Sequence, residues 1–100
     1  MARRAARIDR NQPAIVAALR AAGCTVAITS MVGQGFPDLV VATPAGVLLL
    51  VEIKDGSLPP SARELTPAQR QFHTTWGSRV DVVHSVQEAL ALLETIAEAA

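Results

Sequence analysis

The sequence predicts an α/β domain built on a mixed four-stranded sheet, and three observations carry that prediction. Segments with helical and strand periodicity follow one another in the order α-β-β-β-α-β-α. A tight turn around Pro44 and Gly46 predicts antiparallel pairing of the second and third strands. A helical segment between the third and fourth strands implies a right-handed parallel crossover. We therefore expect helices on both faces of one mixed sheet.

Length and charge indicate one small domain. The chain has 100 residues, 50% of them hydrophobic, which suffices for a single aliphatic core. The formal net charge of zero neither favours nor excludes a nucleic-acid partner. Arginines gather near the start, where Asp9 is the one acidic residue of the first twenty. We expect a basic arm over 1–10, either disordered or attracting polyphosphate, and one domain over 11–100.

The cysteine content and the hydropathy indicate a reducing interior. Cys24 is the single cysteine, so no disulfide framework or cysteine-based metal site is expected. We expect Cys24 to be a small buried apolar residue. No segment approaches the roughly 20 apolar residues that span a membrane, and no signal-type stretch follows the first arginines. The sequence therefore predicts a soluble, cytoplasmic protein without a membrane partner.

The first helix is predicted over residues 11–22. Asn11 or Gln12 can cap its start, and Pro13 suits the first turn. Gly23 suits the end of the helix.

Three strands are predicted next, at residues 25–29, 37–42 and 48–54. Gly33 and Gly35 mark a loop or bulge between the first two. The third is an almost unbroken run of Leu and Val, which predicts a central strand covered on both faces.

The turn between the second and third strands sets their register. Pro44 and Ala45 suit the central positions of a type I turn, and Gly46 suits the left-handed residue that follows. Such a three-residue loop pairs Thr43 with Val47, so opposed residue numbers sum to 90.

By that register, Asp38 lies directly across from Glu52. Side chains alternate along a strand with a period of two, so Lys54 shares the face of Glu52. A loop one residue longer would place the two carboxylates on opposite faces.

The second half of the chain begins with an irregular loop over 55–65. Thr66 and Gln69 form a capping box that opens a second helix, which is expected to run through Trp76. Phe72 and Trp76, one turn apart, are expected in the core.

A fourth strand is predicted at 80–83, followed by a last helix that starts at a capping box of Ser85 and Glu88. Leu90 and Leu93, together with Ala97, are expected to face the interior.

The predicted pairing of Asp38 and Glu52 has a chemical consequence. Two carboxylates about 5 Å apart at Cβ repel each other, and a hard divalent cation reverses that repulsion. Mg²⁺ takes oxygen ligands and commonly uses only one or two carboxylates with water and phosphate. Lys54 can then neutralise a phosphate oxygen or orient a hydrolytic water. This set favours metal-assisted phosphodiester hydrolysis.

Simpler interpretations stay open at this point. Glu52 and Lys54 can form an ordinary surface pair, and the capping box accounts for Gln69 without any catalytic role. His73 lies one turn beyond Gln69 and is a weaker candidate for a ligand or a proton carrier. His84 is expected to be structural or exposed.

The motifs resemble those of a known superfamily. Gly-Phe-Pro-Asp at 35–38 followed by Glu-Ile-Lys at 52–54 resembles the signature of the PD-(D/E)XK nucleases. With Leu-Thr-Pro-Ala-Gln at 65–69, the pattern is most similar to the small VRR-NUC group, often phage-encoded and related to Holliday-junction resolvases. The resemblance covers residues 11–93 and implies a restriction-endonuclease-like αβββαβ core followed by a C-terminal helix.

The resemblance also implies a site. Asp38 and Glu52 would bind Mg²⁺ or Mn²⁺, with the backbone carbonyl of Ile53 as a third ligand. Lys54 would be the catalytic lysine, and Gln69 would lie near the metal and the scissile phosphate.

One departure from the family pattern concerns the first helix. Many members carry a metal-binding glutamate there, whereas the corresponding candidates in this chain are the neutral Asn11 and Gln12. The choice between one and two metal ions therefore stays open.

These features together predict a metal-dependent DNA endonuclease. So short a chain offers little surface for reading bases, so recognition of the backbone or of branched, flapped or junction structures is expected. Four arginines are candidate DNA contacts: Arg7, Arg10, Arg63 and Arg70. A homodimer is expected because a duplex has two strands to cut, with the aliphatic C-terminal helix, which ends in residues 92–96, as a candidate interface. The expected setting is the cytoplasm of a bacterial or phage-infected cell.

Two other functions remain open on the sequence alone. The first is a nuclease-like fold that binds DNA or assembles with partners without turnover. The second is a small α/β domain with no nucleic-acid role, in which Asp38 and Glu52 never meet.

Overall fold

The elements follow the predicted order along the chain. A computed structural model describes residues 8–77 and 79–99, so the predicted arm up to Arg7 lies outside the described residues. The elements are α1 (Gln12–Ala21), β1 (Thr25–Ile28), β2 (Leu39–Ala42), β3 (Leu48–Ile53), the short 3₁₀ helix η1 (Pro60–Ala62), α2 (Pro67–Thr75), β4 (Val80–Val83) and α3 (Val86–Ala99). The loop expected at 55–65 thus contains one short helical turn.

The four strands form one mixed sheet in the order β1-β2-β3-β4. The first three strands are antiparallel neighbours, and β4 lies parallel to β3 after the crossover through α2. Leu39 pairs with Val51 and Ala42 with Leu48, which confirms the predicted sum of 90. The turn causes this register: Gly46 has φ +84° and Thr43 N–H donates to the Val47 carbonyl at 2.9 Å.

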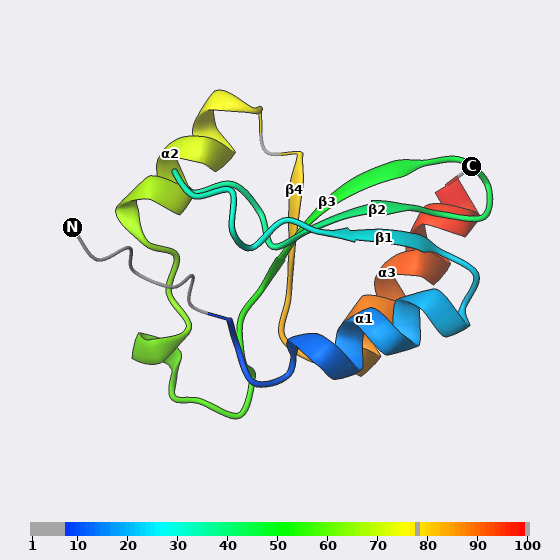
Figure 1. Cartoon of the computed structure of the whole chain (residues 1–100), viewed down its shortest axis with the longest axis horizontal. Helices are drawn as coiled ribbons and strands as arrows, with labels where there is room; N and C mark the ends of the chain where they lie inside the picture. Colours follow the sequence, from blue (N-terminus) through cyan, green and yellow to red (C-terminus); the bar gives the residue numbers. More distant parts are fainter. Residues whose placement is uncertain (1–7, 78, 100) are drawn as a thin grey trace.

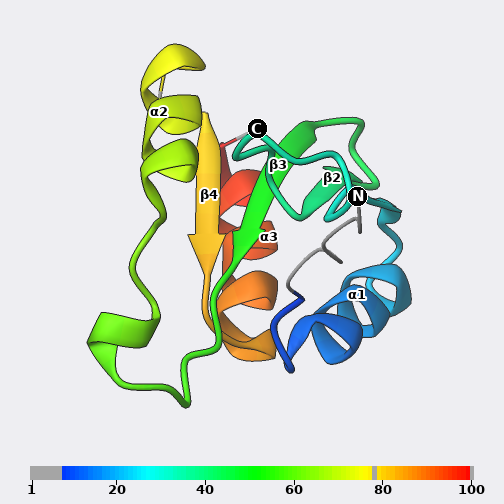
Figure 2. The same ribbon diagram turned by 60° about the vertical axis from the view of Figure 1, so that its left-hand side comes forward.

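The core lies between one face of the sheet and two helices. Helices α1 and α3 contact each other and lie side by side on that face (Figures 1 and 2). The buried apolar residues are Ile15, Val16, Leu19, Cys24, Val26, Leu39, Val41, Leu49, Val51, Ile53, Val83 and Ala89. Cys24 is therefore the buried apolar residue that the sequence predicts.

The opposite face of the sheet is covered only in part. Helices α2 and α3 lie on opposite sides of β4 (Figure 2), and α2 contacts the end of β3 through Gln69 and Glu52. Farther along β3, Leu48 is 72% exposed. Trp76 is 51% exposed. The predictions that β3 is covered on both faces and that Trp76 is a core residue are therefore wrong, because α2 is too short to cover the whole face.

Two helix ends differ from the prediction. Asn11 occupies the N-cap position of α1, but its side chain makes no capping hydrogen bond. At the start of α3, Ser85 Oγ accepts from Glu88 N–H as expected, whereas the Glu88 carboxylate accepts from the His84 N–H.

The inward face of α3 also differs from the prediction. Ala89 is the fully buried residue of this helix, and Leu90 is 37% exposed. Leu93 packs against the core as predicted, together with Leu92 and Ile96, whereas Leu90 and Ala97 are exposed. No helix in residues 8–77 and 79–99 has the length and apolar character needed to cross a membrane.

Candidate functional site

A cavity of about 360 Å³ lies where β2 begins, β3 ends and α2 begins. Its lining residues are Asp9, Asp38, Glu52, Ile53, Lys54, Leu58, Ser61, Ala62, Glu64, Thr66 and Gln69. All four residues predicted to be catalytic therefore lie in one cavity, although they come from three separate segments of the chain.

Asp38 directly precedes β2 and is held from both sides. Its carboxylate accepts from the Ile53 N–H at 2.8 Å, and its backbone carbonyl accepts from the Thr29 N–H at 2.8 Å. Pro37 has no N–H and suits this position at the start of a strand. The Asp38 side chain is thus fixed against the end of β3, next to Glu52.

Glu52 is the most unusual ionisable group of the cavity. It is only 1% exposed, and within residues 8–77 and 79–99 its buried Oε1 has no hydrogen-bond partner. Burial raises the pKa of Glu52 to about 9, helped by a hydrogen bond and charge repulsion from Asp38 and by the charge of Asp9, while Lys54 acts to lower it. In the absence of a cation, Glu52 therefore carries a proton at neutral pH.

Gln69 joins the capping box to the cavity. Its Oε1 accepts from Lys54 Nζ at 2.8 Å and from the Thr66 N–H at 2.9 Å. Its Nε2 donates to Glu52 Oε2 at 3.2 Å. One side chain thus both closes the capping box and contacts Glu52 and Lys54. The capping role of Gln69 and its predicted place in the site therefore do not exclude each other.

Gly35 allows α2 to reach this position. A Cβ at residue 35 would lie 2.2 Å from the Ala68 carbonyl oxygen and 2.9 Å from the Gln69 nitrogen. Gly35 also has φ +77°, a conformation that other residues rarely adopt. The glycine of the 35–38 motif is therefore required by close packing, not only by loop flexibility.

Asp9 is a cavity residue that the sequence interpretation missed. Its Oδ2 accepts from the Asp55 N–H at 2.7 Å, so it holds the backbone directly after Lys54. One feature of the sequence could have indicated a role for this residue: Asp9 is the one acidic residue among the arginines of the first twenty residues. Distance along the chain hid its neighbours, because Asp9 and Asp55 are 46 residues apart.

Asn11 and Gln12, the positions compared above with the family glutamate, do not line the cavity. Asn11 Nδ2 donates to the backbone carbonyls of His84 at 3.1 Å and Lys54 at 3.4 Å. Gln12 Nε2 donates to Ser30 Oγ at 3.0 Å. The side-chain amides of Asn11 and Gln12 thus hold backbone and loop segments in place. The carboxylate that lines the cavity from this part of the chain belongs to Asp9 instead.

The oxygen atoms of the cavity fit a hard divalent cation. The available ligands are all oxygen atoms, from Asp38, Glu52 and the backbone carbonyl of Ile53. A bound cation would also interact with Glu52 Oε1, which has no hydrogen-bond partner among the described residues. Within the described residues, no three His, Cys, Asp or Glu side chains group closely enough to hold a metal by themselves. The set therefore suits an ion such as Mg²⁺ that completes its coordination with water and phosphate.

Comparison with solved structures decides the family. A structure described as a "VRR_NUC domain" shares 33% sequence identity with this chain and superposes with a TM-score of 0.61, covering 85% of this chain and 91% of that one. The chain belongs to the VRR-NUC family. It is thereby a member of the PD-(D/E)XK nuclease superfamily, which confirms the resemblance and the predicted fold class. No family model and no curated protein matches the chain.

The arginines predicted to contact DNA lie in different environments in this VRR-NUC domain. Arg10 is exposed. Arg70 is exposed too and donates to the Leu65 carbonyl. Arg63 is half-buried and lines a neighbouring cavity with Asn11, where its Nε has no partner in the part of the chain that the structure describes. Arg7 lies outside the described residues.

The two histidines do not line the acidic cavity. Burial and the nearby Lys54 lower the pKa of His73, and its buried Nε2 has no partner among the described residues. His84 Nδ1 lies 2.9 Å from Glu88 Oε1 at the start of α3. This contact at the start of α3 agrees with the expectation that His84 is structural or exposed.

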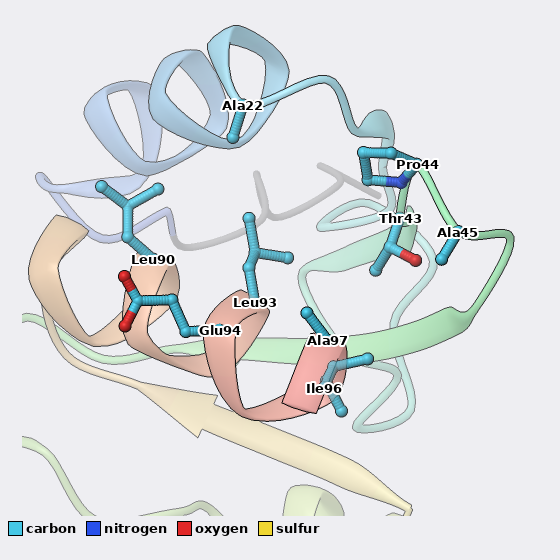
Figure 3. Close-up of a pocket in the computed structure, with 9 residues that line it drawn as sticks. All are labelled: Ala22, Thr43, Pro44, Ala45, Leu90, Leu93, Glu94, Ile96 and Ala97. Carbon is cyan, nitrogen blue, oxygen red and sulfur yellow. The ribbon is translucent and has the colours of Figure 1, made fainter. Parts of the chain in front are cut away.

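A second, apolar groove of about 440 Å³ lies away from the acidic cavity. Figure 3 shows Leu90 and Leu93 of α3 facing Ala22 from the end of α1 and Pro44 from the β2–β3 turn. Ile96 and Ala97 line it too. Leu90 and Ala97, expected in the interior, border this groove instead, next to the segment predicted as a dimer interface.

Proposed function

We propose that this VRR-NUC domain hydrolyses phosphodiester bonds of DNA with the help of a divalent metal ion. The observation that carries the proposal is Glu52, a carboxylate 1% exposed that shares a cavity with Asp38 and Lys54. Burying the Glu52 carboxylate beside the half-buried Asp38 destabilises the fold unless a cation or a proton compensates the charges. A site that binds a cation gives this costly arrangement a function.

Asp38, Glu52 and the Ile53 carbonyl would hold Mg²⁺ or Mn²⁺. When bound, such an ion lowers the pKa of a water molecule and stabilises negative charge on the phosphate. The protein contributes the fixed positions of the ligands: the Ile53 N–H holds Asp38, and Gln69 holds Glu52.

Lys54 would bind the substrate phosphate. It is the single lysine of the chain, and its Nζ reaches the cavity with Gln69 Oε1 as partner. An ammonium group at this position can donate to a non-bridging phosphate oxygen or orient the attacking water. Gln69 would hold Lys54 in place and keep it from pairing directly with Glu52.

We further propose that the substrate is recognised by its backbone and shape. The chain carries 9 basic and 9 acidic residues, so DNA attraction depends on where the basic groups lie and not on net charge. Arg10, Arg63 and Arg70, together with Arg7, are the proposed phosphate contacts. Branched, flapped or junction DNA is the proposed substrate class.

A homodimer belongs to the same proposal, because two strands of a duplex or junction require two cuts. The apolar groove in Figure 3, with Leu93 and Ile96 on its α3 side, is the proposed interface. The molecular mass of the protein in solution tests the proposed homodimer. A monomeric mass at micromolar concentration would contradict it.

Cleavage assays with branched and plain duplex DNA in Mg²⁺ or Mn²⁺ test the activity. Asp38→Asn and Lys54→Ala should each lower the cleavage rate by more than about 100-fold. Glu98→Gln removes an exposed acid on α3 and serves as the control that retains cleavage. Binding of DNA by the wild-type protein without any cleavage would instead support a DNA-binding module without turnover.

A further inference from the structure

A groove beside Trp76 lies outside the acidic cavity and has no role in the proposed reaction. It has a volume of about 440 Å³ and is lined on the uncovered sheet face by Val40, Leu48 and Leu50. Trp76, Arg79 and Asp81 line it too, as does Ile96 of α3. We call these lining residues the Trp76 groove.

Trp76 is the outer member of an aromatic stack. Its ring lies almost parallel to that of Phe72, with centroids 5.0 Å apart and planes inclined by 13°. Phe72 in turn meets Phe36 edge to face at 5.3 Å. Phe72 stacks on one face of the indole, and Trp76 as a whole residue is 51% exposed. The stack thus ends in a half-exposed aromatic residue.

The Trp76 groove lies within one or two nucleotides of the acidic cavity. Leu50 is two residues from Glu52 on the same face of β3, a distance of about 7 Å along a strand. Trp76, which directly follows the last residue of α2, is seven residues from Gln69, about 10 Å along a helix. Both elements therefore lead from the proposed cleavage site to the groove.

We propose that the Trp76 groove binds an unpaired nucleobase of the DNA next to the cleaved phosphate. The base stacks on the indole of Trp76, the apolar side chains of Leu48 and Leu50 contact its edge, and the exposed guanidinium of Arg79 binds the adjoining phosphate. Bases of an intact duplex are already stacked on each other and cannot enter. The inference rests on the proposed function and names its substrate class: DNA with an unpaired nucleotide near the cut.

The chemistry of the groove favours a base over an apolar protein segment. A positive charge at the rim of an aromatic surface matches the combination of phosphate and base in one nucleotide.

Intrinsic fluorescence provides a direct test, because the chain has one Trp and no Tyr. The wild-type protein, in buffer with EDTA so that no cleavage occurs, is titrated with a blunt duplex and with the same duplex bearing a short single-stranded thymidine overhang. Stacking of a base on Trp76 should quench the emission with the overhang substrate and leave it unchanged with the blunt duplex. Equal emission with both substrates at saturating binding would overturn the proposal.

Variants supply an independent readout by filter binding. Trp76→Leu should weaken binding of the overhang substrate by about 5- to 150-fold, the range expected for one stacked base, and blunt-duplex binding by less than threefold. Trp76→Phe keeps an aromatic surface and should restore most of the affinity. Met31→Ala removes another exposed apolar side chain, 61% exposed, and is the matched control. An equal loss on both substrates would contradict the proposal.

Two outcomes separate this inference from its alternatives. Emission that changes with protein concentration in the absence of DNA would show that a second copy of the chain covers the groove, which overturns the proposal. Cleavage of DNA without quenching would leave the nuclease function intact and remove the stacking site. Quenching without cleavage in Mg²⁺ or Mn²⁺ would keep the stacking site and remove the proposed activity.

Discussion

The side-chain amide of Gln69 donates to Glu52 Oε2 at 3.2 Å. This contact links the first turn of α2 to the buried carboxylate at the end of β3. The same side chain also accepts from Lys54 Nζ at 2.8 Å and closes the capping box with Thr66. One residue therefore couples the stability of a helix to the geometry of the proposed site.

Two substitutions at Gln69 should separate these two roles. Glutamate also completes a capping box, so Gln69→Glu should leave the free energy of unfolding at pH 7 within about 0.5 kcal/mol of wild type. It adds a third acid beside Glu52 and removes the amide donor, so cleavage should fall about 10- to 100-fold. Gln69→Ala should lower both cleavage and stability, the latter by about 1 kcal/mol. Urea unfolding and cleavage rates check both, and equal activity of Gln69→Glu and wild type would contradict a role in the site.

Stability in metal-free buffer should fall as the pH rises. Burial raises the pKa of Glu52 from 4.5 to about 9, so the folded protein binds one more proton than the unfolded chain between these values. This contribution to stability is complete below about pH 4.5 and is lost progressively as the pH approaches 9. Glu52→Gln should remove the dependence and stabilise the protein at pH 8 by on the order of 2 kcal/mol.

Urea unfolding at several pH values in EDTA measures this effect. Added Mg²⁺ or Mn²⁺ should raise the melting temperature of the wild type most at high pH, because the ion binds the ionised form and displaces a proton. The same ions should leave Glu52→Gln nearly unchanged. A wild-type stability independent of pH between 5 and 9 would contradict the raised pKa of Glu52.

Gly35 and Gly33 provide a matched pair for the packing of α2. Both have positive φ, +77° and +83°, so alanine strains the backbone similarly at either position, by about 1 kcal/mol. Only at Gly35 does a new Cβ collide with Ala68 and Gln69, whereas nothing lies within 4 Å at Gly33. Gly35→Ala should therefore cost at least about 2 kcal/mol more than Gly33→Ala and displace Gln69, with a loss of cleavage. Similar losses for both variants in thermal unfolding would show that α2 does not depend on this approach.

Asp9 should act mainly by holding the backbone after Lys54. Asparagine keeps an oxygen that can accept from the Asp55 N–H, so Asp9→Asn should retain cleavage within about threefold, whereas Asp9→Ala should lose about 10-fold. Removing the negative charge should also lower the pKa of Glu52 in Asp9→Asn, since that charge helps to raise it. Cleavage rates and the pH dependence of stability check the two effects. An equally large loss in both variants would indicate a direct role of the carboxylate charge.

Local sequence chemistry predicted most of the fold. The Pro44–Ala45–Gly46 turn set the register of β2 and β3 because a positive-φ glycine at its third position permits one pairing of the flanking strands. Capping residues placed the start of α2. The pairing of Asp38 with the end of β3 followed from the same register, since these residues lie close along the chain and on adjacent strands.

Contacts between distant segments were decided only by the tertiary structure. Asp9 meets Asp55, and Asn11 meets His84, because α1 packs on the sheet at one particular position, which periodicity does not specify. Trp76 follows the helical pattern of a core residue, yet it is half exposed because α2 ends before it covers Leu48. The sequence by itself thus determined the elements, their order and the strand register, which depend on local backbone preferences. Packing decided which side chains complete the acidic cavity and which apolar face stays open, since that depends on how the helices are placed over the sheet.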